Sequence, residues 1–251
     1  MKQLHILWLR FLNNKYFGTC LCWLFGNNIP CLQHLPYRFS LQHHPNKNKL
    51  AAPIFWGFYE QHEIKLTQKH FTGLYDVVEL GSSAGVMSSF VISKLSGKKY
   101  IAVEGNSFLN NTFWQNVNKY NRNNCIVTLC NQLIGNKNEA TSFAVQDKVL
   151  ESNFYSTGGK VINTTATTLS NLLQKHHIQA YSLFADIEGA EIFFIEDDNT
   201  ALTNCKEICI ELHEGKFGNH QLSAASMITQ LQSIGFAIAG QSDMTWYFIR
   251  A

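Results

Sequence analysis

The sequence predicts an α/β fold: a doubly wound, mainly parallel sheet with an antiparallel last strand. From about residue 76 onward, short apolar runs alternate with helical patterns, which is typical of a parallel sheet covered by helices on both faces. The chain closes with two apolar runs, 236–239 and 246–249, separated by Gly240-Gln241-Ser242-Asp243 as in a hairpin. With 251 residues and 45% hydrophobic residues, the chain can form one sizeable core.

Residues 1–50 form a separate N-terminal segment in this prediction, and residues 51–251 form the main domain. The segment holds six basic and no acidic residues, whereas all 18 acidic and 14 of the 20 basic residues follow it. It is also rich in Leu, Phe and Trp, although Asn13, Asn14 and Lys15 divide it into runs too short to cross a membrane. Residues 40–50 are polar and contain Pro45, so we expect a linker there.

Two interpretations of this segment stay open. It is either a helical cap packed on the main domain, or an interfacial helix that touches anionic lipid. We expect a cytoplasmic protein, with a peripheral position at the inner membrane face under the second interpretation. The seven cysteines include no Cys-x-x-Cys pair and several fall in apparent strands, which argues for a reducing compartment and against disulfides or zinc.

The first unit of the sheet is a strand, a glycine turn and a helix. Val77 and Val78 belong to a buried strand, and apolar residues at helical spacing follow Gly85. Such a turn presents free backbone N–H groups to a ligand over the strand. The pattern lacks the Gly-x-Gly-x-x-Gly of dinucleotide sites and resembles motif I of S-adenosylmethionine-dependent methyltransferases. We expect five residues here to bind the cofactor: Glu79, Gly81, Ser82, Ser83 and Gly85.

The second strand, 100–103, ends at Glu104, 25 residues after Glu79. A carboxylate at that strand end is suited to accept both hydroxyl protons of a ribose, although it could also be a solvated strand end. After a helix over 108–120 and a strand over 126–129 we expect an irregular stretch to Gly135. Because these strand ends meet at one rim, we add Asn106, Gln132 and Leu133 to the cofactor-binding residues.

The remaining elements continue the alternation. We expect a β-hairpin insertion over 141–165 around Gly158-Gly159, a helix over 168–176, strands over 182–185 and 207–212, and a helix over 222–233. Asp186 and His213 directly follow the last two of these strands, so both should lie at the ligand-binding rim.

A wider resemblance covers Phe55 to Arg250. The run Asp186-Ile187-Glu188-Gly189-Ala190-Glu191, followed by Ile210-Glu211-Leu212-His213, resembles the signature of FkbM-type methyltransferases. Gly57-Phe58-Tyr59-Glu60 and Glu104-Gly105-Asn106-Ser107 are similar to two further segments of that family. Gly105, Ser107, Ala185 and Ser83 depart from the family's usual residues. The resemblance implies a seven-stranded Rossmann-like sheet, S-adenosylmethionine as cofactor, and methylation of a hydroxyl, often on a carbohydrate or a polyketide-like product.

For the chemistry we select Asp186, His213 and Glu188. A hydroxyl acceptor must lose a proton, and Asp186 and His213 are the candidate bases, although His213 could instead make a structural hydrogen bond. For Glu191, a helix-start acid is an equally good interpretation. A divalent metal between Asp186, Glu188 and His213 suits these donor types, but the spacing does not require one, so no metal ligand is assigned.

The acceptor should be a small molecule or a lipid-linked sugar. Nucleic acid is disfavoured because residues 51–251 are acidic overall and carry no stripe of basic and aromatic residues. Two alternatives to an O-methyltransferase remain. One is a non-catalytic cofactor-binding module of the same fold. The other is a nicotinamide-dependent oxidoreductase, which the missing dinucleotide fingerprint disfavours.

Overall fold

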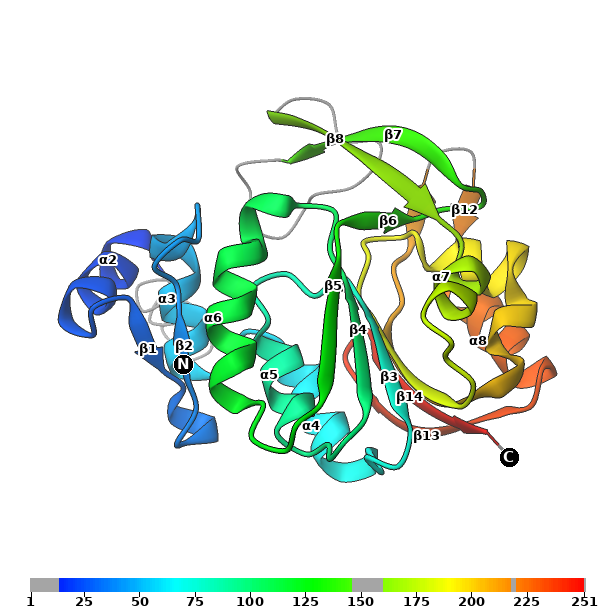
Figure 1. Cartoon of the computed structure of the whole chain (residues 1–251), viewed down its shortest axis with the longest axis horizontal. Helices are drawn as coiled ribbons and strands as arrows, with labels where there is room; N and C mark the ends of the chain where they lie inside the picture. The colour runs from blue at the N-terminus through cyan, green and yellow to red at the C-terminus, as the bar shows by residue number, and fades with distance from the viewer. Residues whose placement is uncertain (1–13, 146–159, 218–219, 251) are drawn as a thin grey trace, which may run out of the picture.

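A computed structural model describes residues 14–145, 160–217 and 220–250. Its centre is a seven-stranded sheet (Figure 1), in which β14 is antiparallel to both of its neighbours and the contacts among β10, β9, β3, β4 and β5 are parallel. The doubly wound sheet with an antiparallel last strand is therefore confirmed. In spatial order the strands are β13 (Phe236–Ser242), β14 (Thr245–Arg250), β10 (Cys205–Glu211), β9 (Tyr181–Ala185), β3 (Asp76–Leu80), β4 (Lys99–Val103) and β5 (Ile126–Cys130).

Helices cover both faces of the sheet, and alternate strand residues supply the two cores. In β3, Val77 belongs to one apolar cluster and Val78 to the other, as the two-residue period of a strand requires. The Val77 face is covered by α4 (Gln61–His70), α5 (Val86–Ile92) and α6 (Asn110–Tyr120), with the short η2 (Ser107–Leu109) before α6. The Val78 face is covered by α7 (Leu169–Lys175), η3 (Phe193–Asp197), η4 (Asn199–Asn204) and α8 (Ala224–Ser233).

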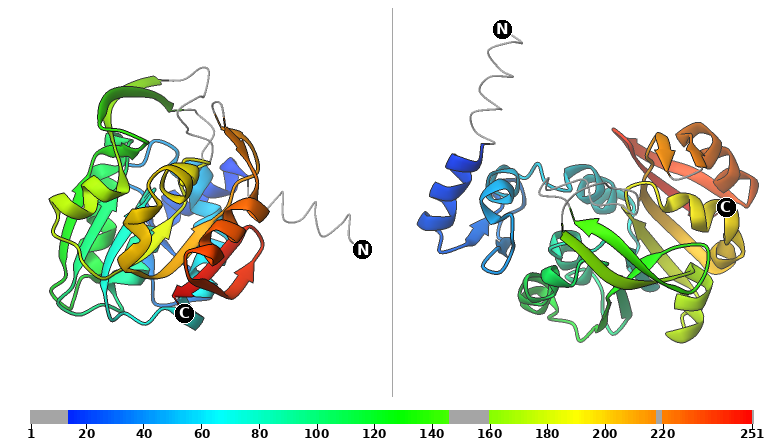
Figure 2. Two further views of the ribbon diagram at one scale, coloured as in Figure 1. Left: turned by 90° about the vertical axis from the view of Figure 1, so that its right-hand side faces the viewer. Right: turned by 90° about the horizontal axis from the view of Figure 1, so that it is seen from above.

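A smaller three-stranded sheet lies beyond the end of β5 (Figure 2). The antiparallel pair β7 (Glu139–Val145) and β8 (Lys160–Thr167) confirms the expected hairpin strands, while Gly158-Gly159 lie outside the described residues. The stretch expected to be irregular contains β6 (Gln132–Ile134), which pairs in parallel with β8, so that prediction was wrong. Three residues are too few for a local pattern, and the partner strand is about 30 residues away in the sequence. A further pair, β11 (Gly215–Phe217) and β12 (His220–Leu222), follows β10.

The N-terminal elements pack beside α5 and α6 (Figure 1). They are α2 (Lys15–Leu24), β1 (Asn28–Pro30), η1 (Leu32–His34), β2 (Arg38–Ser40) and α3 (Lys47–Trp56). Leu21, Ile29 and Phe39 share one apolar cluster with Val86 and Phe113 of the main domain. The backbone N–H of Ser40 also donates to Asn116 Oδ1 at 2.6 Å.

The linker expected over 40–50 was wrong at its end, because α3 begins at Lys47 and buries Leu50. The first turn of α3 is polar, so the sequence there resembles a linker.

All seven cysteines are free, and Cys20 is the exposed one. Within the described part of the chain, no helix has the length and apolarity needed to cross a membrane.

Candidate functional site

The glycine loop between β3 and α5 is held close to the ends of two neighbouring strands. Gly81 donates its backbone N–H to Val103 O at 2.9 Å and adopts a φ of +87°. A Cβ on Gly81 would lie 1.9 Å from the carbonyl oxygen of Asp186, so a side chain cannot fit without moving one of the two strand ends. Gly85 has a φ of +76°, which disfavours other residues, and a Cβ there would lie 3.1 Å from a ring carbon of Phe113. Both predicted glycines are therefore needed for the approach of this loop to the rim.

Glu104 connects the glycine loop to the segment after β4. Its Oε2 accepts the backbone N–H of Ser83 at 2.8 Å, and its Oε1 accepts that of Asn106 at 2.7 Å. Asn106 is itself 7% exposed, and its Oδ1 accepts the N–H of Phe108. Burial raises the pKa of the Glu104 carboxyl, while the two N–H donors lower it. The structure thus brings together the predicted residues Ser83, Glu104 and Asn106.

Glu79 lies beneath the loop. Its side chain is buried, and its Oε2 accepts hydrogen bonds from the hydroxyl groups of Ser88 and Tyr100. Burial raises the pKa of Glu79 to about 7, although both hydrogen bonds act in the opposite direction. Ser82 is likewise buried. Both predicted residues are therefore buried within the structure that holds the glycine loop.

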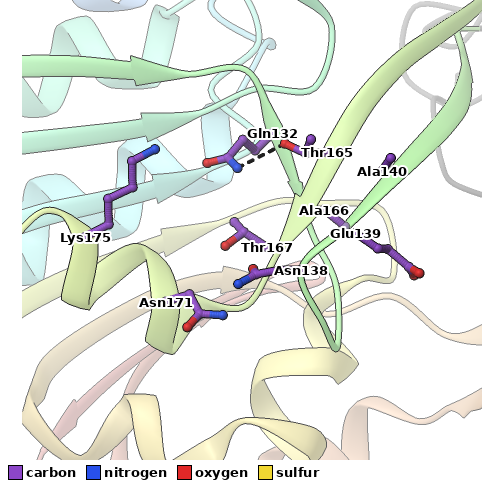
Figure 3. A pocket seen from close by; sticks show the side chains of 9 residues that line it. All are labelled: Gln132, Asn138, Glu139, Ala140, Thr165, Ala166, Thr167, Asn171 and Lys175. Atoms are coloured by element: carbon purple, nitrogen blue, oxygen red, sulfur yellow. Dashed lines mark hydrogen bonds between the residues drawn. The ribbon is translucent and has the colours of Figure 1, made fainter.

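Gln132 and Leu133 come from β6. Gln132 donates from Nε2 to Thr165 Oγ1 at 3.1 Å and faces an open groove of about 490 Å³ beside α7 (Figure 3), while Leu133 is half-buried. The groove is lined mostly by polar side chains of β6, β7, β8 and α7. The Gln132 side chain is therefore engaged within the three-stranded sheet.

The turn between α3 and α4 contributes two residues that the sequence-based site did not include. Tyr59 OH lies 3.1 Å from Ser83 Oγ. Glu60 has a φ of +53°, and its Oε2 is buried without a hydrogen-bond partner. Burial, followed by the charges of Glu79 and Glu63, raises the pKa of Glu60 well above its usual value. The family-like segment 57–60 was the available signal, but only packing reveals that it contacts the glycine loop.

His213 gathers acidic side chains from two adjacent strand ends. Its Nε2 lies 3.5 Å from Glu188 Oε2, and 3.9 Å from both Asp186 Oδ1 and Glu211 Oε1. Its Nδ1 lies 3.4 Å from Glu191 Oε1. Glu191 is fully buried, and the same Oε1 accepts the backbone N–H of Ile187 at 2.9 Å. The structure brings the three predicted catalytic residues together, and Glu191 lies on the Nδ1 side of the imidazole.

The electrostatics of this cluster follow from burial and the number of carboxylates. Burial alone would lower the pKa of His213, but Glu191, Asp186 and Glu188 outweigh it and raise that pKa to about 10. Burial and the Glu211 charge raise the pKa of Asp186 well above its usual value, and burial and Glu63 raise that of Glu211 to about 7. Without a bound ion, the imidazole is therefore a cation at neutral pH, which makes it a hydrogen-bond donor in that state.

The family description "Methyltransferase FkbM domain" matches residues 73–238, which include the glycine loop, Glu104 and the His213 cluster. The chain belongs to the FkbM methyltransferase family. It is an S-adenosylmethionine-dependent methyltransferase with a Rossmann-like sheet, as the sequence predicted. A comparison with curated proteins gave no match.

Several solved structures are similar to this FkbM methyltransferase. One is the methyltransferase FkbM from Methylobacillus flagellatus KT, with 13% identity, a TM-score of 0.47 and coverage of 81% of this chain. This chain covers 51% of that protein, about half its length. Another is a putative RNA methyltransferase from Pyrococcus horikoshii, with 11% identity and a TM-score of 0.41 over 75% of this chain and 82% of that one. A third is Aeropyrum pernix fibrillarin with natively bound S-adenosyl-L-methionine, with 12% identity and a TM-score of 0.38 over 70% and 65% of the two chains.

The side chains at the rim suit this cofactor. S-adenosylmethionine carries a sulfonium and an ammonium, and the rim holds two buried carboxylate oxygens without hydrogen-bond partners, Glu60 Oε2 and Asp186 Oδ1. Unpaired buried carboxylates are costly, so a cationic ligand is the kind of group that would satisfy them.

Proposed function

We propose that this FkbM methyltransferase methylates a hydroxyl oxygen on a carbohydrate, a glycolipid or another secondary metabolite. The observation that supports the proposal is the cluster of Asp186, Glu188 and His213 beside the glycine loop. A hydroxyl acceptor needs its oxygen oriented and its proton removed, and this cluster offers groups for both tasks.

Cofactor binding is assigned to the rim as follows. The backbone N–H groups of Ser83 and Asn106 fix the orientation of the Glu104 carboxylate, and its remaining lone pairs accept hydrogen bonds from the ribose hydroxyls. Glu60 receives the cationic methionyl part, because it has an unpaired buried oxygen. When bound, S-adenosylmethionine supplies an electrophilic methyl group on its sulfonium.

Proton removal is assigned to Asp186. Burial and the neighbouring Glu211 raise its pKa, which makes it a stronger base than an ordinary aspartate. When no ion is bound, the surrounding carboxylates keep His213 protonated, and it donates a hydrogen bond that orients the acceptor oxygen or Asp186 itself.

The test is a screen of sugars, glycolipids and cell extract with labelled S-adenosylmethionine, followed by variants once an acceptor is found. Asp186→Asn should lower the rate by roughly 10²–10⁴-fold, the usual contribution of a placed base. His213→Gln should also impair transfer. Asp197→Asn, an exposed acid in η3, is the matched control. Full activity in both site variants would contradict the proposal, and cofactor binding without any transfer would favour the non-catalytic module.

We also propose a peripheral contact with anionic lipid through α2. Leu21 and Cys22 are buried, whereas Tyr16, Trp23 and Leu24 are 72%, 84% and 65% exposed. Aromatic and apolar side chains exposed on one helix, in a segment without acidic residues, suit a membrane interface. A cytoplasmic enzyme bound to the inner face of the membrane would then meet a lipid-linked sugar acceptor at that same surface.

A further inference from the structure

We propose that Asp186, Glu188 and His213 form a binding site for one divalent cation, Mg²⁺ or Mn²⁺. One oxygen or nitrogen atom from each of the three side chains lies within 4.8 Å of the other two. Asp186 directly follows β9, Glu188 lies two residues further on, and His213 lies two residues after the end of the adjacent strand β10, so the rim of the sheet brings the three together.

The separations suit an octahedral ion. His213 Nε2 lies 3.5 Å from Glu188 Oε2 and 3.9 Å from Asp186 Oδ1. With metal–ligand bonds of about 2.1 Å, neighbouring ligands of an octahedral ion are about 3.0 Å apart and opposite ones about 4.2 Å. Both measured separations fall between these two values, so the side chains need small shifts to bind an octahedral ion.

A second observation is the support behind the imidazole. Nδ1 of His213 faces the carboxylate of Glu191 at 3.4 Å, while Nε2 faces the two carboxylates that would share the ion. Glu191 is fully buried, and its Oε2 has no hydrogen-bond partner. Nδ1 makes no hydrogen bond here, but a carboxylate beside it favours the tautomer with the proton on Nδ1, which leaves Nε2 for a metal ion.

The unpaired atoms indicate that a ligand is needed. Asp186 Oδ1 is buried without a hydrogen-bond partner, although it lies among Glu188, Glu211 and His213. Four carboxyl groups surround a single imidazole here, and a divalent cation at Nε2 would take the place of the imidazole proton among them.

The donor set selects the type of cation. Two carboxylates and one imidazole suit Mg²⁺ or Mn²⁺ better than ions that prefer thiolates, and the three ligands leave positions for water and an acceptor oxygen. The binding of the ion stands on geometry alone. Its use, which is to hold the acceptor hydroxyl beside Asp186, rests on the proposed function.

The test is a titration of the full-length protein, without cofactor, with Mn²⁺ followed by electron paramagnetic resonance. We expect one bound Mn²⁺ per chain, displaced by Mg²⁺, with a nitrogen hyperfine coupling from the imidazole. Glu188→Gln should weaken Mn²⁺ binding at least tenfold, and His213→Gln should also abolish the nitrogen coupling. Glu191→Gln, which changes a positioning residue, should weaken Mn²⁺ binding by about 10–100-fold and keep that coupling.

Glu196→Gln is the matched control, because it removes one exposed carboxylate of η3. Its Mn²⁺ affinity should equal that of the wild type, and thermal melting should show that each variant is folded. No bound Mn²⁺ at millimolar concentration would overturn the proposal, as would equal binding in the wild type and in folded Glu188→Gln and His213→Gln. Calorimetry with S-adenosylhomocysteine tests the cofactor site independently of the metal site. If the protein binds S-adenosylhomocysteine but no Mn²⁺, this inference is overturned and the proposed function is not.

Discussion

Two glutamates of the predicted cofactor site have different surroundings. Glu79 is buried beneath the glycine loop and accepts hydrogen bonds from Ser88 and Tyr100, whereas Glu104 holds the loop from the rim through Ser83. The sequence shows both only as acids close to strand ends. Glu104 is therefore the one whose change should affect cofactor binding directly.

Glu104→Ala should weaken binding of S-adenosylhomocysteine by about 1.5–3 kcal/mol, the typical range for hydrogen bonds to a charged group, which is at least about tenfold in Kd. Isothermal titration calorimetry measures the loss. Glu196→Ala serves as the control, since it removes an exposed carboxylate elsewhere. An unchanged Kd in a folded Glu104→Ala protein would show that Glu104 has no part in the cofactor site.

At the residue scale, the sequence was informative where a side chain directly follows a strand. Asp186 and His213 could be placed at one rim because both follow apolar runs. Glu60 and Glu191 could not be assigned in this way, because their significance depends on burial. Glu60 reaches the loop through a left-handed turn, and Glu191 is enclosed behind His213. Neither environment leaves a local pattern in the sequence.

At the element scale, α2 presents a buried and an exposed face, and a pair of variants separates their roles. Leu21→Ala should destabilise the protein by about 2–5 kcal/mol, because it removes a core side chain. Trp23→Ala should leave stability nearly unchanged, since Trp23 is 84% exposed, but should weaken binding to anionic vesicles. Urea unfolding and vesicle co-sedimentation measure the two effects.

The control for these measurements is salt. Contacts between basic side chains and anionic lipid weaken as the salt concentration rises, whereas packing of Leu21 in the core does not depend on it. If the wild-type protein does not sediment with anionic vesicles at low salt, the membrane proposal fails and α2 is a cap only.

Long periodic elements were the predictable ones. The helices α6 and α7 and the strand pair β13–β14 lie close to their expected ranges, because each has its own apolar period. The short strand β6 and the start of α3 were missed. β6 exists only through its pairing with β8, and α3 begins with polar residues that resemble a linker.

At the scale of the whole molecule, the rim concentrates buried carboxyls, and stability should therefore depend on pH. The folded-state pKa of Glu79 is about 7, above its usual 4.5, because of burial. Its contribution to stability is fully present below about pH 4.5 and is lost as the pH rises through about 7. Glu211, with a pKa also raised to about 7, acts in the same direction.

The unfolding free energy of the protein without cofactor should thus fall between about pH 4.5 and pH 8. Glu79→Gln keeps a neutral side chain at every pH, so the stability of this variant relative to the wild type should rise over that interval by on the order of 3 kcal/mol. Urea unfolding at several pH values provides the measurement. Parallel stability profiles for wild type and Glu79→Gln would mean that Glu79 does not titrate in this range.

The doubly wound, mainly parallel sheet could be expected from the alternation of strands and helices, but the position of residues 14–56 could not. Their apolar residues fit a cap as well as an interfacial helix, and only the shared cluster with Phe113 and Val86 shows that part of the segment completes the core. The exposed residues of α2 leave the membrane contact as a separate proposal.

The central claim is that the rim formed by the glycine loop, Glu60 and Glu104 binds S-adenosylmethionine. Calorimetric titration of the full-length protein with S-adenosylmethionine, S-adenosylhomocysteine and NAD tests it most directly. We predict one site per chain for the first two ligands and none for NAD, because the loop lacks the dinucleotide spacing of glycines. Tight binding of NAD, with no binding of the other two ligands, would contradict the account.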